Sequence, residues 1–147
     1  MDARRTKRWC LTAVAAAVLC LAPPGAVGEM ITFTSCGCVQ AGGSNIAVSS
    51  YAVPTACDWN GDGLNDLIVG EKYDTSTGKV RIYLNQGTPA APAYASWSYI
   101  QAGGGDLTVT ASGCGPAFPR VTDWNNDGLC DLLVGDGVGR VVLFVNG

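Results

Sequence analysis

A segment of this chain occurs twice, and this internal duplication limits the folds that the chain can adopt. Residues 52–70 return as residues 117–135, which is 65 positions later. Two flanking segments also return, 61 positions later: 39–43 as 100–104, and 80–85 as 141–146. The two offsets differ by four residues, and this difference falls in the intervening loops. Repetition of this kind predicts two copies of one structural unit, stacked so that each buries the apolar side of the other.

Each unit has the residue pattern of β-strands. Residues 67–70 are apolar with β-branched side chains, and residues 79–85 alternate between polar and apolar side chains. Clusters of Gly, Pro, Ser and Thr separate these segments. No segment after residue 28 keeps a helical period, so the predicted fold class is all-β. In the first unit we expect strands at 52–57, 67–72, 79–85 and 96–102.

The second unit has fewer strand candidates than the first. It contains counterparts of the first three strands, but its sequence ends at Gly147 without a fourth. The segment 30–40, which aligns with the fourth strand and precedes the first unit, is the missing counterpart. We therefore expect one domain, 29–147, with units at about 52–103 and 117–147. Its two four-stranded antiparallel sheets are offset by one strand, which residues 30–40 supply.

The N-terminus has the features of a cleaved signal peptide. Four basic residues lie between Arg4 and Arg8, an apolar run covers 9–22, and small residues are found at 26–28. The alternative is a membrane anchor, but a run of this length is shorter than the roughly 20 residues that a spanning helix needs. We therefore expect residues 1–28 to be removed. The predicted product is not an integral membrane protein, and it is secreted or found at the cell surface or in the periplasm.

The charge and the cysteines of residues 29–147 exclude several classes of function. These residues include five basic and eleven acidic side chains, a net charge of −6, which argues against nucleic acid as a partner. The chain has no histidine, so zinc sites and histidine-based catalysis are poorly supported. An exported protein permits disulfides. The sequence leaves the pairing of its five cysteines open: Cys36, Cys38, Cys57, Cys114 and Cys130.

Each unit contains an acidic loop with the pattern Asp-x-Asn-x-Asp-Gly-x-x-Asp. Calcium prefers six to eight oxygen ligands, which carboxylates, amide oxygens and main-chain carbonyls supply. The loops place such groups at positions 1, 3, 5, 7 and 9, with a main-chain carbonyl at position 7. The sequence therefore predicts two Ca²⁺ sites with these ligands: Asp58, Asn60, Asp62, Leu64 and Asp66 in the first loop, and Asp123, Asn125, Asp127, Leu129 and Asp131 in the second.

Two other classes of loop share part of this pattern. Asn, Asp and Gly are common in ordinary polar turns, but the repeated oxygen positions favour a metal site. A helical EF-hand or dockerin loop needs an acidic residue at position 12, where this chain has Val69 and Val134. Three carboxylates in one short loop repel each other unless a cation lies among them. Calcium therefore remains the favoured prediction, with magnesium disfavoured because it demands near-ideal octahedral geometry.

The loop and the strands that follow it resemble a known family. Residues 58–70 with 78–85, and residues 123–135 with 139–146, are similar to the FG-GAP/VCBS repeat of integrin-type β-propellers. The resemblance implies four-stranded propeller blades with calcium between the first two strands, in secreted or surface proteins that often serve adhesion. The chain lacks the Phe-Gly and Gly-Ala-Pro elements of the family. Two blades cannot close a ring, so we expect a partial propeller or a ring completed by several copies.

The predicted function is a binding or adhesion module for a protein or glycan ligand, in which calcium braces each blade. The alternatives are a fragment of a larger propeller, a structural envelope or matrix component, and the framework of a carbohydrate-active enzyme. No set of nucleophile, base and orienting group can be assembled, so no catalytic residue and no enzyme activity are predicted. Trp59 and Trp124, at the same position of each loop, are expected to pack between blades rather than to stack on sugars.

Overall fold

The described part of the chain contains β-strands and turns but no helix. The computed structural model describes residues 33–147, and Cys38–Gly147 form one unit within it. The predicted all-β class is confirmed for these residues. The expected signal peptide, residues 1–28, lies outside them. No helix among the described residues has the length and apolar character that membrane crossing requires.

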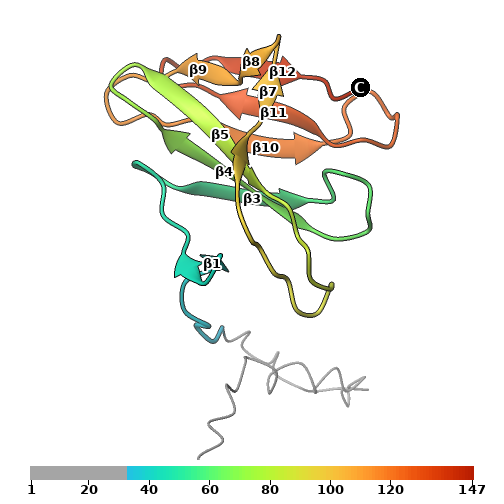
Figure 1. Ribbon diagram of the computed structural model, residues 1–147. Helices are drawn as coiled ribbons and strands as arrows, with labels where there is room; N and C mark the ends of the chain where they lie inside the picture. Colours follow the sequence, from blue (N-terminus) through green and yellow to red (C-terminus); the bar gives the residue numbers. More distant parts are fainter. Residues whose placement is uncertain (1–32) are drawn as a thin grey trace, which may run out of the picture. The chain divides into compact units, whose positions relative to one another are not determined.

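The first unit forms an antiparallel sheet (Figure 1). Four strands lie side by side in chain order, and a fifth, β9, pairs with the opposite end of β5 from β6. The strands are β3 (Val53–Cys57), β4 (Asp66–Lys72), β5 (Thr77–Tyr83), β6 (Ser98–Tyr99) and β9 (Thr108–Thr110). The strands expected at 52–57, 67–72 and 79–85 correspond to β3, β4 and β5.

The second unit forms a sheet of three antiparallel strands. They are β10 (Phe118–Thr122), β11 (Asp131–Gly135) and β12 (Val141–Phe144), in chain order. Its first hairpin has the register of the first unit, because Pro54 faces Val69 and Pro119 faces Val134. The sequence duplication is therefore also a duplication of strand pairing. Among the described residues, none of the sheets closes on itself.

Two small hairpins share the sequence Gln-Ala-Gly-Gly. One pairs β1 (Gln40–Ala41) with β2 (Ser44–Asn45), and the other pairs β7 (Gln101–Ala102) with β8 (Gly105–Asp106). Both glycines of each turn have positive φ, between +57° and +85°, a conformation that glycine adopts at little cost. The repeated Gln-Ala-Gly-Gly segments therefore encode turns.

Two expected strands differ from the structure. The strand expected over 96–102 is divided into β6 and β7 at Ile100, which is 7% exposed. Its N–H donates to the Val80 carbonyl of β5 at 3.0 Å, and its carbonyl accepts from Leu107 N–H at 2.7 Å. Ile100 is therefore still bonded to the sheet, and the chain enters the β7–β8 hairpin directly after it. The strand expected over 30–40 is not formed at residues 33–39, because the chain first pairs at Gln40, within the β1–β2 hairpin. Residues 30–32 lie outside the described part.

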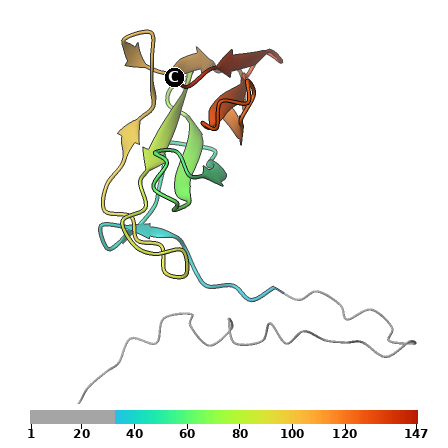
Figure 2. The same ribbon diagram turned by 90° about the vertical axis from the view of Figure 1, so that its right-hand side faces the viewer.

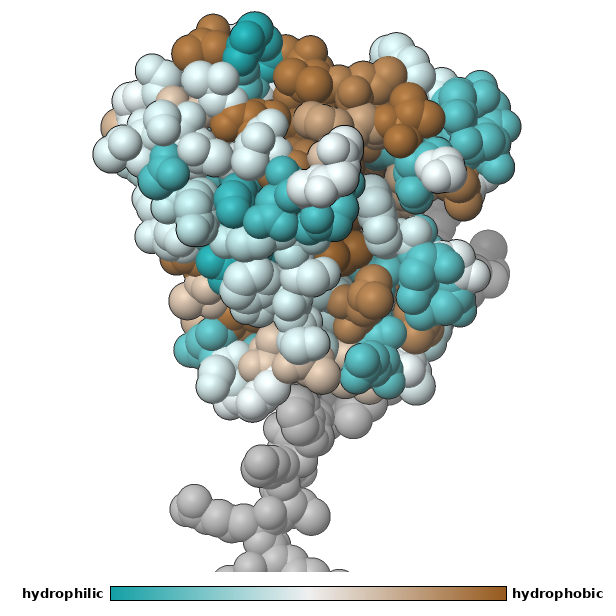
Figure 3. All heavy atoms as spheres, turned by 45° about the horizontal axis from the view of Figure 1, so that its top comes forward, coloured by the Kyte–Doolittle hydropathy of each residue, from teal (hydrophilic) through white to brown (hydrophobic). Residues whose placement is uncertain are grey.

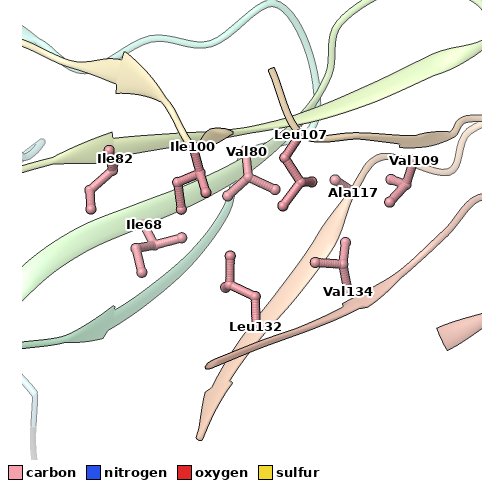
Figure 4. Close-up of a cluster of buried hydrophobic side chains, with 9 residues drawn as sticks. All are labelled: Ile68, Val80, Ile82, Ile100, Leu107, Val109, Ala117, Leu132 and Val134. Carbon is pink, nitrogen blue, oxygen red and sulfur yellow. The ribbon is translucent and has the colours of Figure 1, made fainter. Parts of the chain in front are cut away.

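The two sheets share one apolar core. Figures 1 and 2 show β10–β12 lying next to β3–β5, and Figure 4 shows side chains from both sheets pointing toward one another. Both sheets and the segments that link them contribute to the cluster: Ile68, Val80, Ile82, Ile100, Leu107, Val109, Ala117, Leu132 and Val134. This cluster lies between the two sheets, within the compact unit Cys38–Gly147.

The two units contact the core through opposite faces. Ile68 is fully buried in the cluster, but its counterpart Leu133 lies outside it and is half-buried. The reverse holds for Leu132, which is fully buried, and its counterpart Leu67. Side chains alternate between the faces of a strand, so a shift by one residue exchanges the faces. Two sheets related by a two-fold axis would bury the same face twice. Burial of opposite faces instead arises when units stack in one direction.

Gly70 lies where the second unit passes closest to the first. A Cβ atom added to Gly70 would lie 2.2 Å from the Ala117 carbonyl oxygen and 2.4 Å from Pro119 Cδ. At the equivalent position of the second unit, a Cβ atom on Gly135 would have Phe118 Cβ as its nearest neighbour, at 3.5 Å. At this repeat position, the main chain of Ala117 therefore leaves no room for a side chain on Gly70, whereas Gly135 has room for one.

Gly70→Ala is expected to destabilise the protein, whereas Gly135→Ala is not. The methyl group on residue 70 must push the main chain at Ala117 away, and overpacking of this kind costs about 1–3 kcal/mol. The matched change at residue 135 should alter the free energy of unfolding by less than about 0.5 kcal/mol. Urea denaturation followed by circular dichroism measures both. Equal losses in the two variants would show that the close approach at Gly70 does not exist in solution.

Candidate functional site

The first acidic loop, residues 58–66, is held together by its own side chains. Asp58 Oδ1 accepts a hydrogen bond from Asp62 N–H at 3.0 Å, and Asp58 Oδ2 accepts one from Gly63 N–H at 2.8 Å. Asp62 Oδ1 accepts from Leu64 N–H at 2.9 Å, and Asp62 Oδ2 from Asn60 Nδ2 at 2.9 Å. Positions 1, 3 and 5 of the predicted calcium site are thus brought together on the turn between β3 and β4.

The second acidic loop, residues 123–131, repeats this network between β10 and β11. Asp123 accepts from the N–H groups of Asp127 and Gly128 at 3.1 and 2.9 Å. Asp127 accepts from Leu129 N–H at 2.8 Å and from Asn125 Nδ2 at 2.7 Å. The two loops differ at position 4, yet both residues there have positive φ, +74° for Gly61 and +61° for Asn126. The loop conformation therefore depends on the Asp, Asn and Gly residues that the two copies share.

The aspartate at position 9 of each loop is buried and joins the loop to the end of a distant strand. Asp66 is fully buried, and its carboxylate accepts from Trp59 N–H at 3.0 Å and from Asn85 N–H at 2.7 Å. Asp131 is also fully buried and makes the same two bonds, each 2.8 Å long, at the equivalent positions. The role of Asn85 was not predicted from the sequence, although the repetition of 80–85 as 141–146 indicates that this segment belongs to the repeat.

Within residues 33–147, no cationic side chain is paired with a carboxylate of either loop. In residues 33–147, ion pairs join Lys79 to Asp106, Arg81 to Glu71 and Arg140 to Asp136, and none includes a loop aspartate. Each loop thus holds three carboxylates, one of them fully buried, with no side-chain positive charge to offset them. Mutual repulsion of such groups is relieved when a cation binds among them.

The donor set of the loops suits calcium, although the side chains do not converge on one point in the structure. Every predicted ligand offers oxygen from a carboxylate, an amide or the main chain, which is the ligand type that Ca²⁺ prefers. Within residues 33–147, no group of three or more carboxylate, cysteine or histidine side chains forms a metal-binding cluster. The loop carboxylates instead hold main-chain N–H groups.

The two loop tryptophans have different surroundings. Trp59 packs against the shared core and is half-buried, whereas Trp124 is 58% exposed. The expected packing between units is thus found for Trp59 and not for Trp124. This difference follows from the stacking, because the face of the second unit that corresponds to the buried face of the first has no neighbour among the described residues.

A buried ion pair beside the first sheet was not anticipated from the sequence. Glu71 is fully buried and accepts hydrogen bonds from Arg81 Nε and Nη2 at 2.8 and 2.9 Å, from Ser49 N–H at 2.8 Å and from Tyr99 O–H at 2.9 Å. Burial acts to raise the pKa of Glu71, but the hydrogen bonds and the charge of Arg81 outweigh it, so the pKa is lowered. In the sequence, an acidic residue follows the last glycine of each repeat and could have indicated this ion pair. These residues are Glu71 in one unit and Asp136 in the other, and both are buried.

Cys57 and Cys130 lie together between the two loops. Cys57 ends β3, and the Cys130 thiol donates a hydrogen bond to the carbonyl oxygen of Asp58 at 3.5 Å. Burial, followed by a hydrogen bond with the Cys130 thiol, raises the pKa of the Cys57 thiol. The tertiary structure thus brings together two of the cysteines whose pairing the sequence left open.

Comparison with known proteins finds similarity to an integrin subunit. Integrin alpha-4 of Xenopus laevis is 31% identical to this chain over 113 residues, which cover 71% of this chain and 10% of that relative. The chain therefore spans about a tenth of the length of the relative that it matches. No protein-family model matches the sequence, and no solved structure matches it. The similarity agrees with the resemblance to the repeats of integrin-type proteins.

Proposed function

We propose that this chain is an exported repeat module for adhesion or recognition that binds one Ca²⁺ ion in each of its two acidic loops. The observation that carries the proposal is the identical hydrogen-bond network of the two loops, which places the same oxygen-bearing side chains at the same positions. The same side chains also hold main-chain N–H groups, so they keep the loop folded as well as offering oxygen atoms to a cation. Uncompensated carboxylates provide the electrostatic reason for a cation.

In this proposal calcium braces the units rather than acting as a sensor. Each loop joins the first two strands of its unit, and its last aspartate also holds the main chain after the third strand. A cation bound there would tie three strand ends to one point. Such a site stabilises the folded state by mass action, because the unfolded chain does not preform it.

We also propose that the two units are blades of a larger propeller. Stacking through opposite faces leaves the second unit with an open apolar side, on which Phe118 is 43% and Val141 71% exposed. Figure 3 shows apolar surface in the region where β8, β9 and β12 lie. Hollows of about 580 and 470 Å³ run along β12, the free edge of the second sheet. Further copies of this chain would supply the missing blades, or, alternatively, the rest of a longer chain would.

Mass measurement in solution separates these two sources of blades. A ring built from copies predicts a closed oligomer of uniform mass in the presence of calcium, measured by light scattering after size-exclusion chromatography. A monodisperse monomer under the same conditions would exclude the ring and favour the fragment of a longer propeller.

The proposed ligand of the module is a protein, because the similarity is to an integrin alpha subunit. A glycan ligand and a purely structural role in an envelope or matrix are the alternatives. A glycan array discriminates them, since reproducible binding would favour a lectin. The proposed role is not enzymatic.

Calcium binding is tested by titration calorimetry and thermal unfolding of the protein. The expected stoichiometry is two for the wild type, one for Asp62→Ala and one for Asp127→Ala. Calcium at 100 times its dissociation constant stabilises a protein by about 2.7 kcal/mol per site, so the wild-type melting temperature should rise with calcium. That rise should be smaller in each single variant and absent in the double variant.

A matched control separates loss of a ligand from damage to the loop. Asn126→Gly gives the second loop the residue that the first has at position 4, where both have positive φ. This variant should keep both sites. A wild-type protein that takes up no calcium would refute the metal proposal. Two sites that persist in Asp62→Ala would place the metal elsewhere.

A further inference from the structure

Two cysteines interrupt the repeat at different positions and nevertheless meet in space. Cys57 stands where the second unit has Thr122, and Cys130 stands where the first unit has Asn65. They are 73 positions apart in the sequence. The fold brings β3 against β10, so the end of the first strand of one unit reaches the acidic loop of the other. Neither cysteine is required by the repeat, which makes their meeting a property of the interface between units.

The geometry of this pair suits a covalent bond. The Cys130 sulfur lies 3.5 Å from the carbonyl oxygen of Asp58, the residue after Cys57, so the two thiols are close neighbours. Both side chains are half-buried, and Cys57 packs against the shared core. A disulfide requires two cysteines whose Cα atoms lie within about 7 Å of each other, and the packing of the two sheets makes these two cysteines neighbours.

The remaining cysteines of the described chain occupy different surroundings. Cys36, Cys38 and Cys114 are exposed. None of them lies at the contact between β3 and the second acidic loop. The pairing that the sequence left open among five cysteines therefore has one candidate that packing brings together across the two units.

We propose that Cys57 and Cys130 form a disulfide that joins the two repeat units. A disulfide such as oxidised glutathione is the oxidant. One protein thiolate attacks it to form a mixed disulfide and release one glutathione, and the second protein thiolate then displaces the other. The two thiols lose two electrons and two protons, and oxidised glutathione becomes two molecules of glutathione. This proposal does not depend on calcium or on the adhesive role.

The disulfide should stabilise the folded protein substantially. It closes the loop from residue 57 to residue 130, which includes most of the first unit and the start of the second. The entropy that a cross-link removes from the unfolded chain grows with the length of the closed loop. We expect the oxidised protein to melt about 10 °C or more above the reduced protein. Because the link holds the two acidic loops together, it would also fix the contact between the units.

The test uses the full chain after refolding with oxidised glutathione, followed by peptide mapping without reduction. Trypsin isolates Cys130 in the peptide 121–140, and chymotrypsin, which cuts after Tyr51, separates Cys57 from Cys36 and Cys38. The expected result is a linked pair of peptides that contain Cys57 and Cys130. The higher melting temperature of the oxidised protein should disappear on reduction with dithiothreitol. The variants Cys57→Thr and Cys130→Asn, each carrying the residue of the other unit, should lack both the link and the gain.

Several outcomes would overturn the proposal. One is alkylation of both thiols by iodoacetamide in the oxidised protein, and another is linkage of Cys57 to a different cysteine. A disulfide that forms without raising the melting temperature would show that it does not stabilise the folded protein. Cys114→Ser is the control, and it should keep the link and the gain. If either Cys57→Thr or Cys130→Asn failed to fold, the other variant would still test the proposal. The comparison of oxidised with reduced wild-type protein would test it as well.

Discussion

Glu71→Gln is expected to lower the free energy of unfolding by about 3–5 kcal/mol at neutral pH. Glutamine keeps the shape of the side chain but removes the charge that neutralises Arg81, whose side chain is only 11% exposed. Arg81 would then be a buried cation without a counter-ion, and the bidentate bond of 2.8 and 2.9 Å would be lost. Urea denaturation of both proteins at pH 7 measures the difference.

This difference should shrink in acid. The pKa of Glu71 is lowered from an ordinary value of 4.5, because the bonds from Arg81, Ser49 and Tyr99 outweigh the effect of burial. A carboxyl group with a lowered pKa stabilises the folded state fully above its unfolded pKa, and this stabilisation disappears as the pH falls through its folded pKa. The gap between wild type and Glu71→Gln should therefore be complete above about pH 5 and should narrow below about pH 4.

Asp136→Asn is the matched control for this ion pair. Asp136 follows the last glycine of its repeat as Glu71 does, but its partner Arg140 is 64% exposed. Water can solvate Arg140 when the counter-ion is neutralised, so we expect a loss of only about 1 kcal/mol. Equal losses in the two variants, or a Glu71→Gln gap that does not change between pH 7 and pH 3, would contradict the assigned role of Glu71.

Ile68→Ala is expected to cost about 2–5 kcal/mol, while the same truncation at the equivalent position, Leu133→Ala, should cost about 1 kcal/mol or less. Ile68 is fully buried in the cluster between the sheets, so its truncation leaves a cavity. Leu133 is half-buried and lies outside the cluster, so solvent and neighbouring side chains can fill the space. Thermal and urea unfolding of the two variants would show this difference.

The reciprocal pair provides the control. Leu132 is fully buried in the cluster, and its counterpart Leu67 is half-buried outside it. The large loss in the free energy of unfolding is therefore expected for Leu132→Ala in the second unit and for Ile68→Ala in the first. If the equivalent variants Ile68→Ala and Leu133→Ala both caused the large loss of stability, the two units would be related by two-fold symmetry. The stacking described above would then be wrong.

The local features of the protein could be predicted from residues close together in the sequence. The alternation around β5 and the apolar run of β4 predicted strands, because the side-chain period of a strand is set by its own backbone. The shared Asp, Asn and Gly residues predicted two equivalent loops, and both loops have the same internal hydrogen bonds. Calcium in these loops remains a prediction. The break at Ile100 was not foreseen, because it depends on the core that lies beyond the strand.

Only the tertiary structure decided which face of each unit is buried and which residues meet between the units. Equivalent residues such as Ile68 and Leu133 have similar side chains, so their sequence positions cannot show that one lies in the core and the other does not. Cys57 and Cys130 are distant in the sequence and occupy different repeat positions, so no spacing rule could pair them. The duplication itself determined that two alike units exist. The direction in which they stack depends on contacts between sheets, and these form only when the chain is folded.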